Sequence, residues 1–323
     1  MAACTLRRFL KFSRITQMQH RTISVYTETH GFHEDALKKK LSQFSGGSVD
    51  LSLDDSGIGV LTLNNPSRMN AFTGTMMVEL LDRVKELEDW KDGKGLIVRG
   101  AGNTFCSGSD LKAVKAISSS HASMKMCMYM QNTLTRLSRL PLISVALVQG
   151  KALGGGAELS TACDFRSGGM ELSSRVLHNF PIKRGLNIAI KLMTPESEIR
   201  FVHKHMGLVP GWGGAARLVH IIGGRCSLQL LSSAHKVNPE QALGMGLIDA
   251  ILSSGDRPLD ETHKWLSQFT EGPVEVIQAI KKVVVSGREQ QLEAALRTEK
   301  DIFGTVWGGP SNLQALSQGT KHK

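Results

Sequence analysis

The 323-residue sequence contains no run of 18 or more apolar residues, which argues against a transmembrane helix and against a membrane partner. Its five cysteines are odd in number and widely scattered, and none of them forms a CxxC pair. The sequence therefore predicts neither a disulfide framework nor a zinc site, and we expect no metal site. A reducing compartment suits such cysteines.

Acidic residues are absent from the first 27 positions, which hold several arginines together with serine and threonine. This composition is typical of a mitochondrial transit peptide, but a disordered basic tail would have it too. Residues 1–40 carry +5 of the net charge of +10, and residues 167–191 carry another +3. Because the rest of the chain is nearly neutral, we expect no nucleic-acid partner.

Three short apolar segments, at residues 57–65, 95–100 and 142–149, favour strands. Apolar residues recur at helical spacing over residues 71–90, and residues 122–139 favour a second helix that Pro141 ends. Strands that alternate with helices predict an α/β fold with a parallel sheet. From Pro239 onward we expect almost only helix.

The strongest local signal is the segment Ala152-Leu-Gly-Gly-Gly-Ala-Glu158, which follows the third strand. Its glycines permit a sharp turn, and the first N–H groups of the helix that begins there have no partner within the helix. Such N–H groups can hold an oxyanion, with Glu158 one turn along the same face. A packing joint between strand and helix, with Glu158 complementing the helix dipole, would give the same pattern.

A second loop of this kind, Asn103-Thr-Phe-Cys-Ser-Gly-Ser-Asp-Leu111, follows the 95–100 strand. Ligands bind at the carboxyl ends of strands in open α/β folds, so the two loops can each supply one N–H group to a ligand. For Asp110, the N-cap of the following helix is a simpler role than catalysis.

Together with Asn65-Pro-Ser-Arg-Met-Asn-Ala-Phe72 and Pro210-Gly-Trp-Gly-Gly214, these loops follow the order and spacing of one known superfamily. The sequence resembles the crotonase (enoyl-CoA hydratase/isomerase) superfamily over about residues 50–305. The resemblance implies a crotonase-like ββα-spiral core with a helical C-terminal trimerisation region, and hence a homotrimer or a dimer of trimers. It divides the chain into a basic leader at 1–45, expected to be disordered, a core at 46–235 and a helical region at 236–323.

By the same resemblance, the N–H groups of Ser107 and Gly155 form the oxyanion hole for a thioester carbonyl, and Glu158 is a catalytic carboxylate. The substrate is an acyl-CoA thioester, and no cofactor beyond that coenzyme A is implied. The residues expected to contact the substrate are Arg68, Met69, Ala71, Ser107, Gly108, Ser109, Asp110, Gly154, Gly155 and Trp212. Arg68 could reach a phosphate as a cation or remain a solvated turn residue.

Hydratases of this superfamily use a second glutamate, and His203 stands at its position here. Because water addition needs a carboxylate pair, this substitution disfavours hydration. The segments 192–197, 200–204 and 305–310 resemble the vertebrate branch that decarboxylates ethylmalonyl-CoA and, less favourably, methylmalonyl-CoA. That branch implies a cytosolic metabolite-repair carboxy-lyase that yields butyryl-CoA or propionyl-CoA. Glu158 and His203 are both candidates for the catalytic proton donor.

Residues 167–191 depart from the family pattern, in which Cys-Asp-Phe-Arg runs almost directly into Leu-Met-Thr-Pro-Glu-Ser. Removing these 25 residues would restore an ordinary family member, so we expect the stretch to interrupt a core strand. Two other functions stay open. One is hydration or isomerisation of an enoyl-CoA, and the other is non-catalytic acyl-CoA binding on the same scaffold.

Overall fold

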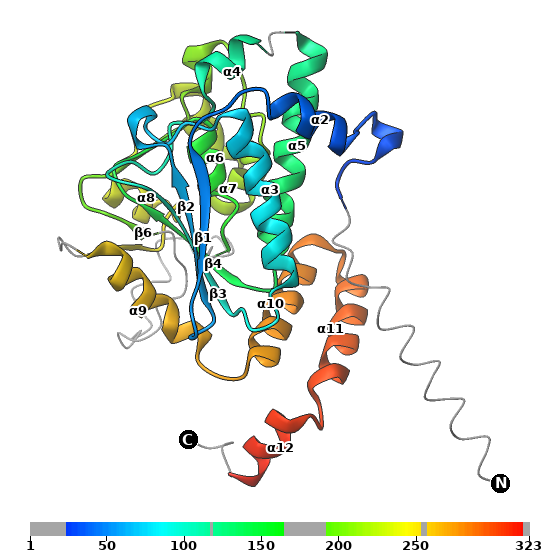
Figure 1. Cartoon of the computed structure of the whole chain (residues 1–323). Coiled ribbons are helices and arrows are strands. Elements are labelled where there is room, and N and C mark those ends of the chain that lie inside the picture. The colour runs from blue at the N-terminus through cyan, green and yellow to red at the C-terminus, as the bar shows by residue number, and fades with distance from the viewer. Residues whose placement is uncertain (1–23, 117–118, 165–191, 253–256, 319–323) are drawn as a thin grey trace.

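The structure is a computed structural model that describes residues 24–116, 119–164, 192–252 and 257–318 (Figure 1). No helix in these ranges is long and apolar enough to cross a membrane. The elements, in chain order, are η1 (Glu28–His30), α2 (Glu34–Leu41), β1 (Ser48–Leu53), β2 (Ile58–Asn64), η2 (Pro66–Arg68), α3 (Gly74–Asp89), β3 (Gly95–Gly100), α4 (Leu111–Ala116), α5 (Ser120–Arg139), β4 (Ile143–Val148), β5 (Lys151–Leu153), α6 (Gly155–Ser160), β6 (Leu192–Met193), β7 (Glu198–Arg200), η3 (Val202–Met206), α7 (Gly214–Ser233), α8 (Pro239–Gly244), β8 (Ala250–Ile251), α9 (Pro258–Thr270), α10 (Val274–Glu289), α11 (Leu292–Val306) and α12 (Pro310–Ser317).

The main sheet has the strand order β1-β2-β3-β4-β6-β8, and a second, small sheet pairs β5 with β7. All neighbours in the main sheet are parallel except β1, which runs antiparallel to β2. The expected α/β class and parallel sheet are therefore confirmed. Figure 1 shows α3 and α5 on one side of the sheet and α9 on the other.

Both faces of the central strands are buried, because helices pack on each side of the sheet. Successive residues of a strand point to opposite faces, so they enter different cores. Leu96 and Val98 of β3 belong to the larger core, which α3 and α5 complete. Ile97, between them, belongs to a smaller core together with Leu266 of α9. This double burial explains why β3 and β4 read as continuous apolar runs in the sequence.

The expected strands at 57–65, 95–100 and 142–149 correspond to β2, β3 and β4, and the helices at 71–90 and 122–139 correspond to α3 and α5. From Pro239 onward the described chain is helical except for the two-residue strand β8. Three short elements carried no usable pattern. These are α2, whose residues are mostly charged, and the three-residue strands β5 and β7.

The second half of the expected leader is ordered, so the prediction of disorder over 1–45 is wrong for its described part. Leu37 and Leu41 of α2 and Phe32 before it are buried in the larger core. Lys38 forms an ion pair with Asp82 of α3 at 2.6 Å. The few apolar residues of this segment stand among several lysines, so the composition did not predict that they pack in the core. The acid-free residues up to 23 lie outside the described residues.

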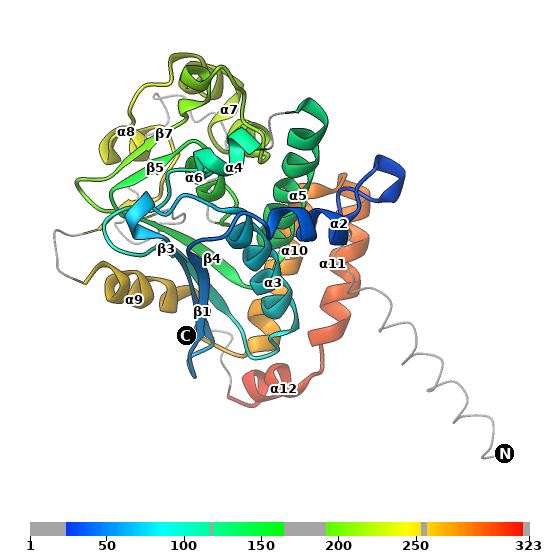
Figure 2. The same ribbon diagram turned by 45° about the horizontal axis from the view of Figure 1, so that its top comes forward.

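The C-terminal helices α10, α11 and α12 leave many large apolar side chains exposed, and α11 and α12 lie at the edge of the body (Figures 1 and 2). The exposed residues are Ile280, Val284, Leu292, Leu296, Phe303, Trp307, Leu313 and Leu316. Exposed apolar side chains that gather on neighbouring helices usually mark an interface with another protein surface.

The two described ends of the 167–191 stretch lie beside one strand, while the stretch itself lies outside the described residues. Before it, the Asp164 N–H donates to the Ser144 carbonyl at 3.2 Å, and the Asp164 carboxylate accepts from the Ser144 N–H at 2.9 Å. After it, Leu192 of β6 pairs with Leu147. Ser144 and Leu147 are three residues apart on β4, which is about 10 Å along a strand. Two residues between Asp164 and Leu192 would cover that distance.

Deleting residues 167–191 is therefore expected to raise the melting temperature and the turnover of the acyl-CoA substrate that the sequence resemblance implies. The shortened chain keeps two residues to join Asp164 to Leu192 and can extend β6 along β4. A gain of about 1 kcal/mol would raise the melting temperature by roughly 2 °C. Thermal melts and turnover of the full-length and shortened proteins check this. A full-length protein that melts higher and reacts faster would show that the stretch is a working part of the fold.

Candidate active site

The candidate site forms where the 69–72 segment, the 106–110 loop and β5 meet, beside α4, α6 and α7 (Figure 2). The 106–110 loop runs between the 69–72 segment and β5, because Cys106 bridges to Ala152 and Ser109 bridges to Phe72. A methyl group placed on Gly108 would lie 3.0 Å from the nitrogen of Gly155. The expected meeting of the two glycine-containing loops is therefore confirmed.

The turn into α6 depends on glycine at two consecutive positions. Gly154 is the N-cap and has φ 51° and ψ −118°, a conformation that residues with side chains rarely adopt. Gly155 begins the helix, and a methyl group on it would lie 2.7 Å from the Trp212 indole. Trp212 is buried and packs edge-to-face on Phe72, with 5.6 Å between the ring centroids. The Trp212 ring therefore covers Gly155 from one side.

The Ser107 N–H is not available for the role expected of it, because it donates to the Met69 carbonyl at 3.0 Å. Three residues on, the Asp110 N–H donates to the Phe72 carbonyl at 2.8 Å. The Phe72 N–H in turn donates to the Gly108 carbonyl at 2.7 Å, so Phe72 bonds to the residues on either side of Ser109. In such a parallel bridge, the N–H of the middle residue, Ser109, points away from Phe72. Among the described residues, neither the Ser109 N–H nor the Gly155 N–H has an acceptor. On this geometry, Ser109 rather than Ser107 is the candidate partner of Gly155.

Glu158 is 1% exposed, and its carboxylate joins three parts of the site. One oxygen, Oε2, accepts from the N–H groups of Trp212 and Gly214, both at 2.8 Å. The other oxygen, Oε1, accepts from the Gly211 N–H at 3.2 Å and lies 2.9 Å from His203 Nε2. Buried carboxylates are stabilised when donors fill their acceptor positions. Glu158 is thus held as an acceptor by the loop that leads into α7.

His203 lies in η3 beside the turn into α6, since a methyl group on Gly154 would be 3.9 Å from its Nε2. An ionised carboxylate can only accept hydrogen bonds, so Nε2 carries the proton that faces Glu158. Within the described part of the chain, His203 Nδ1 is buried and has no hydrogen-bond partner. The two candidate proton donors therefore form one pair, and Nδ1 is the ring nitrogen of that pair that has no partner among the described residues.

Two residues of α5 that the sequence did not single out contact the same loop. The Sγ of Cys127 lies 2.8 Å from a methyl group placed on Gly211, and Gln131 Nε2 donates to the Gly211 carbonyl at 2.8 Å. Burial and the negative charge of Glu158 raise the pKa of the Cys127 thiol, so it stays protonated at neutral pH. Their spacing of four residues on a helix places them on one face, but no sequence signal links that face to Gly211.

Asp110 is the N-cap of α4, as its simpler interpretation predicts. Its Oδ1 accepts from the N–H groups of Lys112 (2.9 Å) and Ala113 (3.3 Å), and its Oδ2 pairs with Arg68 at 2.8 Å. Partial burial raises the pKa of Asp110, but the Arg68 bond and the two N–H groups outweigh it and bring the pKa below its usual value. A pocket of about 220 Å³ lies here, lined by Phe44, Ser45, Arg68, Thr73, Asp110, Lys112 and Ala113.

The other expected substrate contacts fall around this loop. Met69 is 45% exposed and has a left-handed backbone with φ 53°, whereas Ala71 is buried. Asn70, which the sequence analysis passed over, is buried and also left-handed. Its side chain accepts from the Asn65 N–H at 2.9 Å and donates to the Ala101 carbonyl at 2.9 Å. Asn70 therefore fixes the shape of the segment that holds the 106–110 loop.

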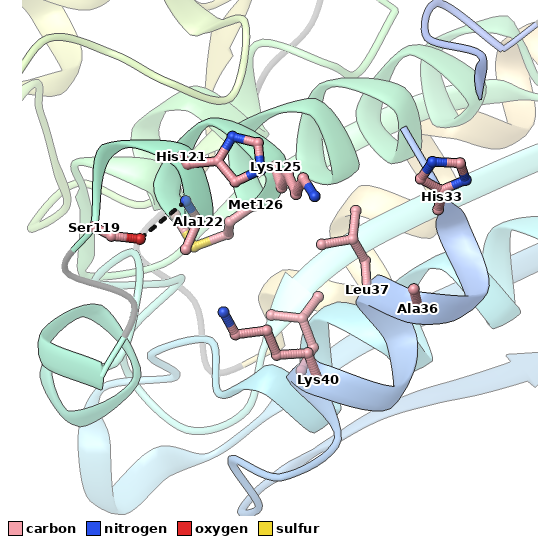
Figure 3. Close-up of a pocket in the computed structure, with 10 residues that line it drawn as sticks. His33, Ala36, Leu37, Lys40, Ser119, His121, Ala122, Lys125 and Met126 are labelled. Atoms are coloured by element: carbon pink, nitrogen blue, oxygen red, sulfur yellow. Dashed lines mark hydrogen bonds between the residues drawn. The ribbon is translucent and has the colours of Figure 1, made fainter. Parts of the chain in front are cut away.

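A larger pocket, of about 270 Å³, lies between α2 and α5, away from the residues described above (Figure 3). It is lined by His33, Ala36, Leu37, Lys40, Leu41, Ser119, His121, Ala122, Lys125 and Met126. None of the expected site residues belongs to it, so pocket size alone does not locate the site. The described ranges also contain no group of three or more His, Cys, Asp or Glu side chains that could hold a metal ion.

Comparison with known proteins shows which family shares this sequence and this fold. The model of the enoyl-CoA hydratase/isomerase family matches residues 54–171 and 188–309. The match breaks off within the 167–191 stretch. Ethylmalonyl-CoA decarboxylase of Gallus gallus is 62% identical over 323 residues, which cover 99% of this chain and 100% of that protein. The Homo sapiens enzyme of the same name is 54% identical, and the alignment covers 98% of this chain and 96% of that protein.

Solved structures show the same fold at low sequence identity. An enoyl-CoA hydratase from Bacillus anthracis superposes with a TM-score of 0.71 at 20% identity, over 84% of this chain and 96% of that one. An enoyl-CoA hydratase from Mycobacterium smegmatis superposes with a TM-score of 0.72, also at 20% identity, over 85% and 96%. The expected crotonase-like fold is therefore confirmed.

Glu158→Gln is expected to destabilise the protein as well as to affect the site. The amide would point an NH₂ group at N–H donors of the 211–214 loop and leave them unpaired. Unpaired buried groups of this kind cost about 2–4 kcal/mol in total. Chemical denaturation measures the loss, with Thr161→Ser at the C-cap of the same helix as a mild control. An unchanged free energy of unfolding would contradict the role of Glu158 in holding this loop.

Proposed function

Because the chain belongs to the enoyl-CoA hydratase/isomerase family and matches ethylmalonyl-CoA decarboxylases along almost its whole length, we propose that it decarboxylates ethylmalonyl-CoA. The product is butyryl-CoA, and methylmalonyl-CoA is a poorer substrate that gives propionyl-CoA. The observation that carries this proposal over hydration is the pairing of Glu158 with His203 at 2.9 Å. A hydratase would need a second carboxylate at the position of His203.

The reaction breaks the bond between the α-carbon and its carboxylate carbon. The electron pair of that bond moves into the thioester, so CO₂ leaves and an enolate forms. The enolate then takes one proton at the α-carbon to give the saturated acyl-CoA. The thioester itself accepts the electrons, so the proposed reaction requires no metal ion and no organic cofactor.

The N–H groups of Ser109 and Gly155 are the proposed oxyanion hole. They lack acceptors among the described residues, and they belong to two loops that lie against each other. An enolate oxygen carries more negative charge than a thioester carbonyl, so fixed donors stabilise the transition state more than the substrate. The buried indole of Trp212 excludes water from one side of Gly155, which strengthens these bonds.

His203 is the better candidate for the proton donor. The Glu158 carboxylate already accepts from the N–H groups of Gly211, Trp212 and Gly214, and it bonds to His203 Nε2. His203 Nδ1 is buried and has no hydrogen-bond partner among the described residues. In its doubly protonated form, His203 can pass the Nδ1 proton to the α-carbon while Nε2 stays bonded to Glu158. Glu158 then acts by orienting the ring.

We assign the coenzyme A part of the substrate to the side of the site where Arg68 and Lys112 lie. Arg68 and Lys112 line the 220 Å³ pocket, and Arg68 keeps part of its guanidinium exposed beside Asp110. Guanidinium and ammonium groups are common ligands of phosphate. The exposed apolar side chains of α10–α12 suit assembly of the chain into a homotrimer or a dimer of trimers. We propose a cytosolic metabolite-repair role, with a mitochondrial location as the alternative because the N-terminus is basic and acid-free.

The direct test is mass spectrometry of the products from ethylmalonyl-CoA, methylmalonyl-CoA, malonyl-CoA and crotonyl-CoA. We expect loss of CO₂ from ethylmalonyl-CoA to be fastest, with little hydration of crotonyl-CoA, and we expect EDTA to leave the rate unchanged. Faster hydration than decarboxylation would favour a hydratase, and binding without turnover of any thioester would favour a non-catalytic protein. EDTA-sensitive turnover would contradict the metal-free mechanism.

Ser109→Pro is expected to lower kcat by about 10²–10³-fold, because it removes one oxyanion donor. Ser109→Ala keeps the N–H and serves as the matched control, with near-normal turnover expected. Circular dichroism and a thermal melt confirm that both variants fold. A folded Ser109→Pro protein with the wild-type kcat would remove this N–H from the mechanism.

His203→Gln is expected to lower kcat by about 10²–10⁴-fold, as is usual when a general acid is lost. The glutamine can still donate a hydrogen bond to Glu158, so the melting temperature should change little. Steady-state kinetics and a thermal melt on the same preparation separate the two effects. A variant that keeps full turnover would return the proton-donor role to Glu158.

A further inference from the structure

The N-terminal segment 24–33 contacts α5, the helix that supports the active-site loop. The hydroxyl of Tyr26 donates to Gln131 Oε1. Beside it, the Ser24 hydroxyl and the Val25 N–H donate to Asn132 Oδ1 at 2.8 and 3.1 Å. The family match begins only at residue 54, so this segment lies outside the part of the chain that the family shares.

Gln131 connects this segment to the site through the other end of its amide. Its Nε2 donates to the Gly211 carbonyl at 2.8 Å, and the Gly211 N–H donates to Glu158 Oε1 at 3.2 Å. Oε1 is also the atom that bonds to His203 Nε2. A continuous path of hydrogen bonds therefore runs from Tyr26 through Gln131 and Gly211 to the Glu158–His203 pair.

The direction of each bond in this path is fixed by chemistry. The Gly211 carbonyl can only accept, so the Gln131 amide must turn its NH₂ group toward Gly211. Its oxygen then faces Tyr26, whose hydroxyl donates to it. Removing the hydroxyl leaves that oxygen without this partner and frees the amide to rotate. The bond that holds Gly211 from the side opposite Glu158 would weaken with it.

Gly211 needs such support, because it has no side chain and lies in the loop between η3 and α7. Gly207 and Gly213, at either side of it in this loop, both have positive φ angles of 67° and 83°. On the inner side, the loop is held by its N–H groups on Glu158. On the outer side, Gln131 holds the carbonyl of Gly211. Small shifts of catalytic groups are costly, so the outer bond matters for rate.

We propose that Tyr26 and Gln131 are positioning residues for the Glu158–His203 pair. The ordered N-terminal segment is then a working part of the active site, although it touches no reacting atom. The inference rests on the proposed decarboxylation, since it concerns the rate of that reaction. It predicts that the segment acts on the chemical step rather than on binding of coenzyme A.

The test compares Tyr26→Phe and Gln131→Met with the control Ser24→Ala, all in the full-length chain. Ser24 belongs to the same segment, and its hydroxyl bonds to Asn132 Oδ1 and to the backbone carbonyl of Tyr26. Neither bond is part of the path from the Tyr26 hydroxyl to Gly211. We expect Tyr26→Phe and Gln131→Met to lower kcat for ethylmalonyl-CoA by about 5- to 50-fold, with KM within about twofold of wild type. Ser24→Ala should keep both constants.

A double-substitution cycle with His203→Gln decides whether the effect runs through the pair. If it does, adding Tyr26→Phe to His203→Gln causes little further loss of kcat. Full additivity of the two losses, an unchanged kcat in Tyr26→Phe, or an equal loss in Ser24→Ala would each overturn the proposal. Wild-type protein that fails to decarboxylate ethylmalonyl-CoA would instead defeat the proposed function, so the two failures are distinguishable.

Discussion

One buried carboxylate organises the site. Glu158 is the point at which α6, η3 and the loop before α7 are joined, because its two oxygens bond to three backbone N–H groups and one imidazole. A charge buried so deeply is tolerated only while its donors are present, and the loop that supplies them is tolerated only while the charge is present. The position of Trp212, the orientation of His203 and the path to Tyr26 all follow from this mutual dependence.

Much of the fold could be predicted from the sequence, because periodicity reports burial. The strands β2, β3 and β4 are apolar on both faces, and α3 repeats its buried residues at helical spacing. The segments that failed are those whose packing is set by distant partners. The charged helix α2 looks like part of a basic tail, yet three apolar side chains in and before it reach the core. Composition could not reveal that placement.

The same distinction between local pattern and distant partners holds for the candidate site. The glycines at 154 and 155, the carboxylate at 158 and the histidine at 203 are recognisable from order and spacing, and the structure brings them together. The choice between Ser107 and Ser109 is not recognisable, because it depends on which N–H the Met69 carbonyl occupies. Likewise, Cys127 and Gln131 reach the site only because α5 packs against the loop that contains Gly211. Neighbours in space that are remote in sequence leave no local pattern.

The contact between Gly155 and Trp212 also constrains how this site can change during evolution. Any side chain larger than hydrogen at position 155 would collide with the indole, since the added carbon would lie 2.7 Å from the ring. A smaller residue at 212 would relieve the collision but uncover the N–H of Gly155 and remove the edge-to-face contact with Phe72. Neither residue can be substituted alone without loss of one of these contacts. In descendants of this chain, substitutions at positions 155 and 212 are therefore expected to occur together.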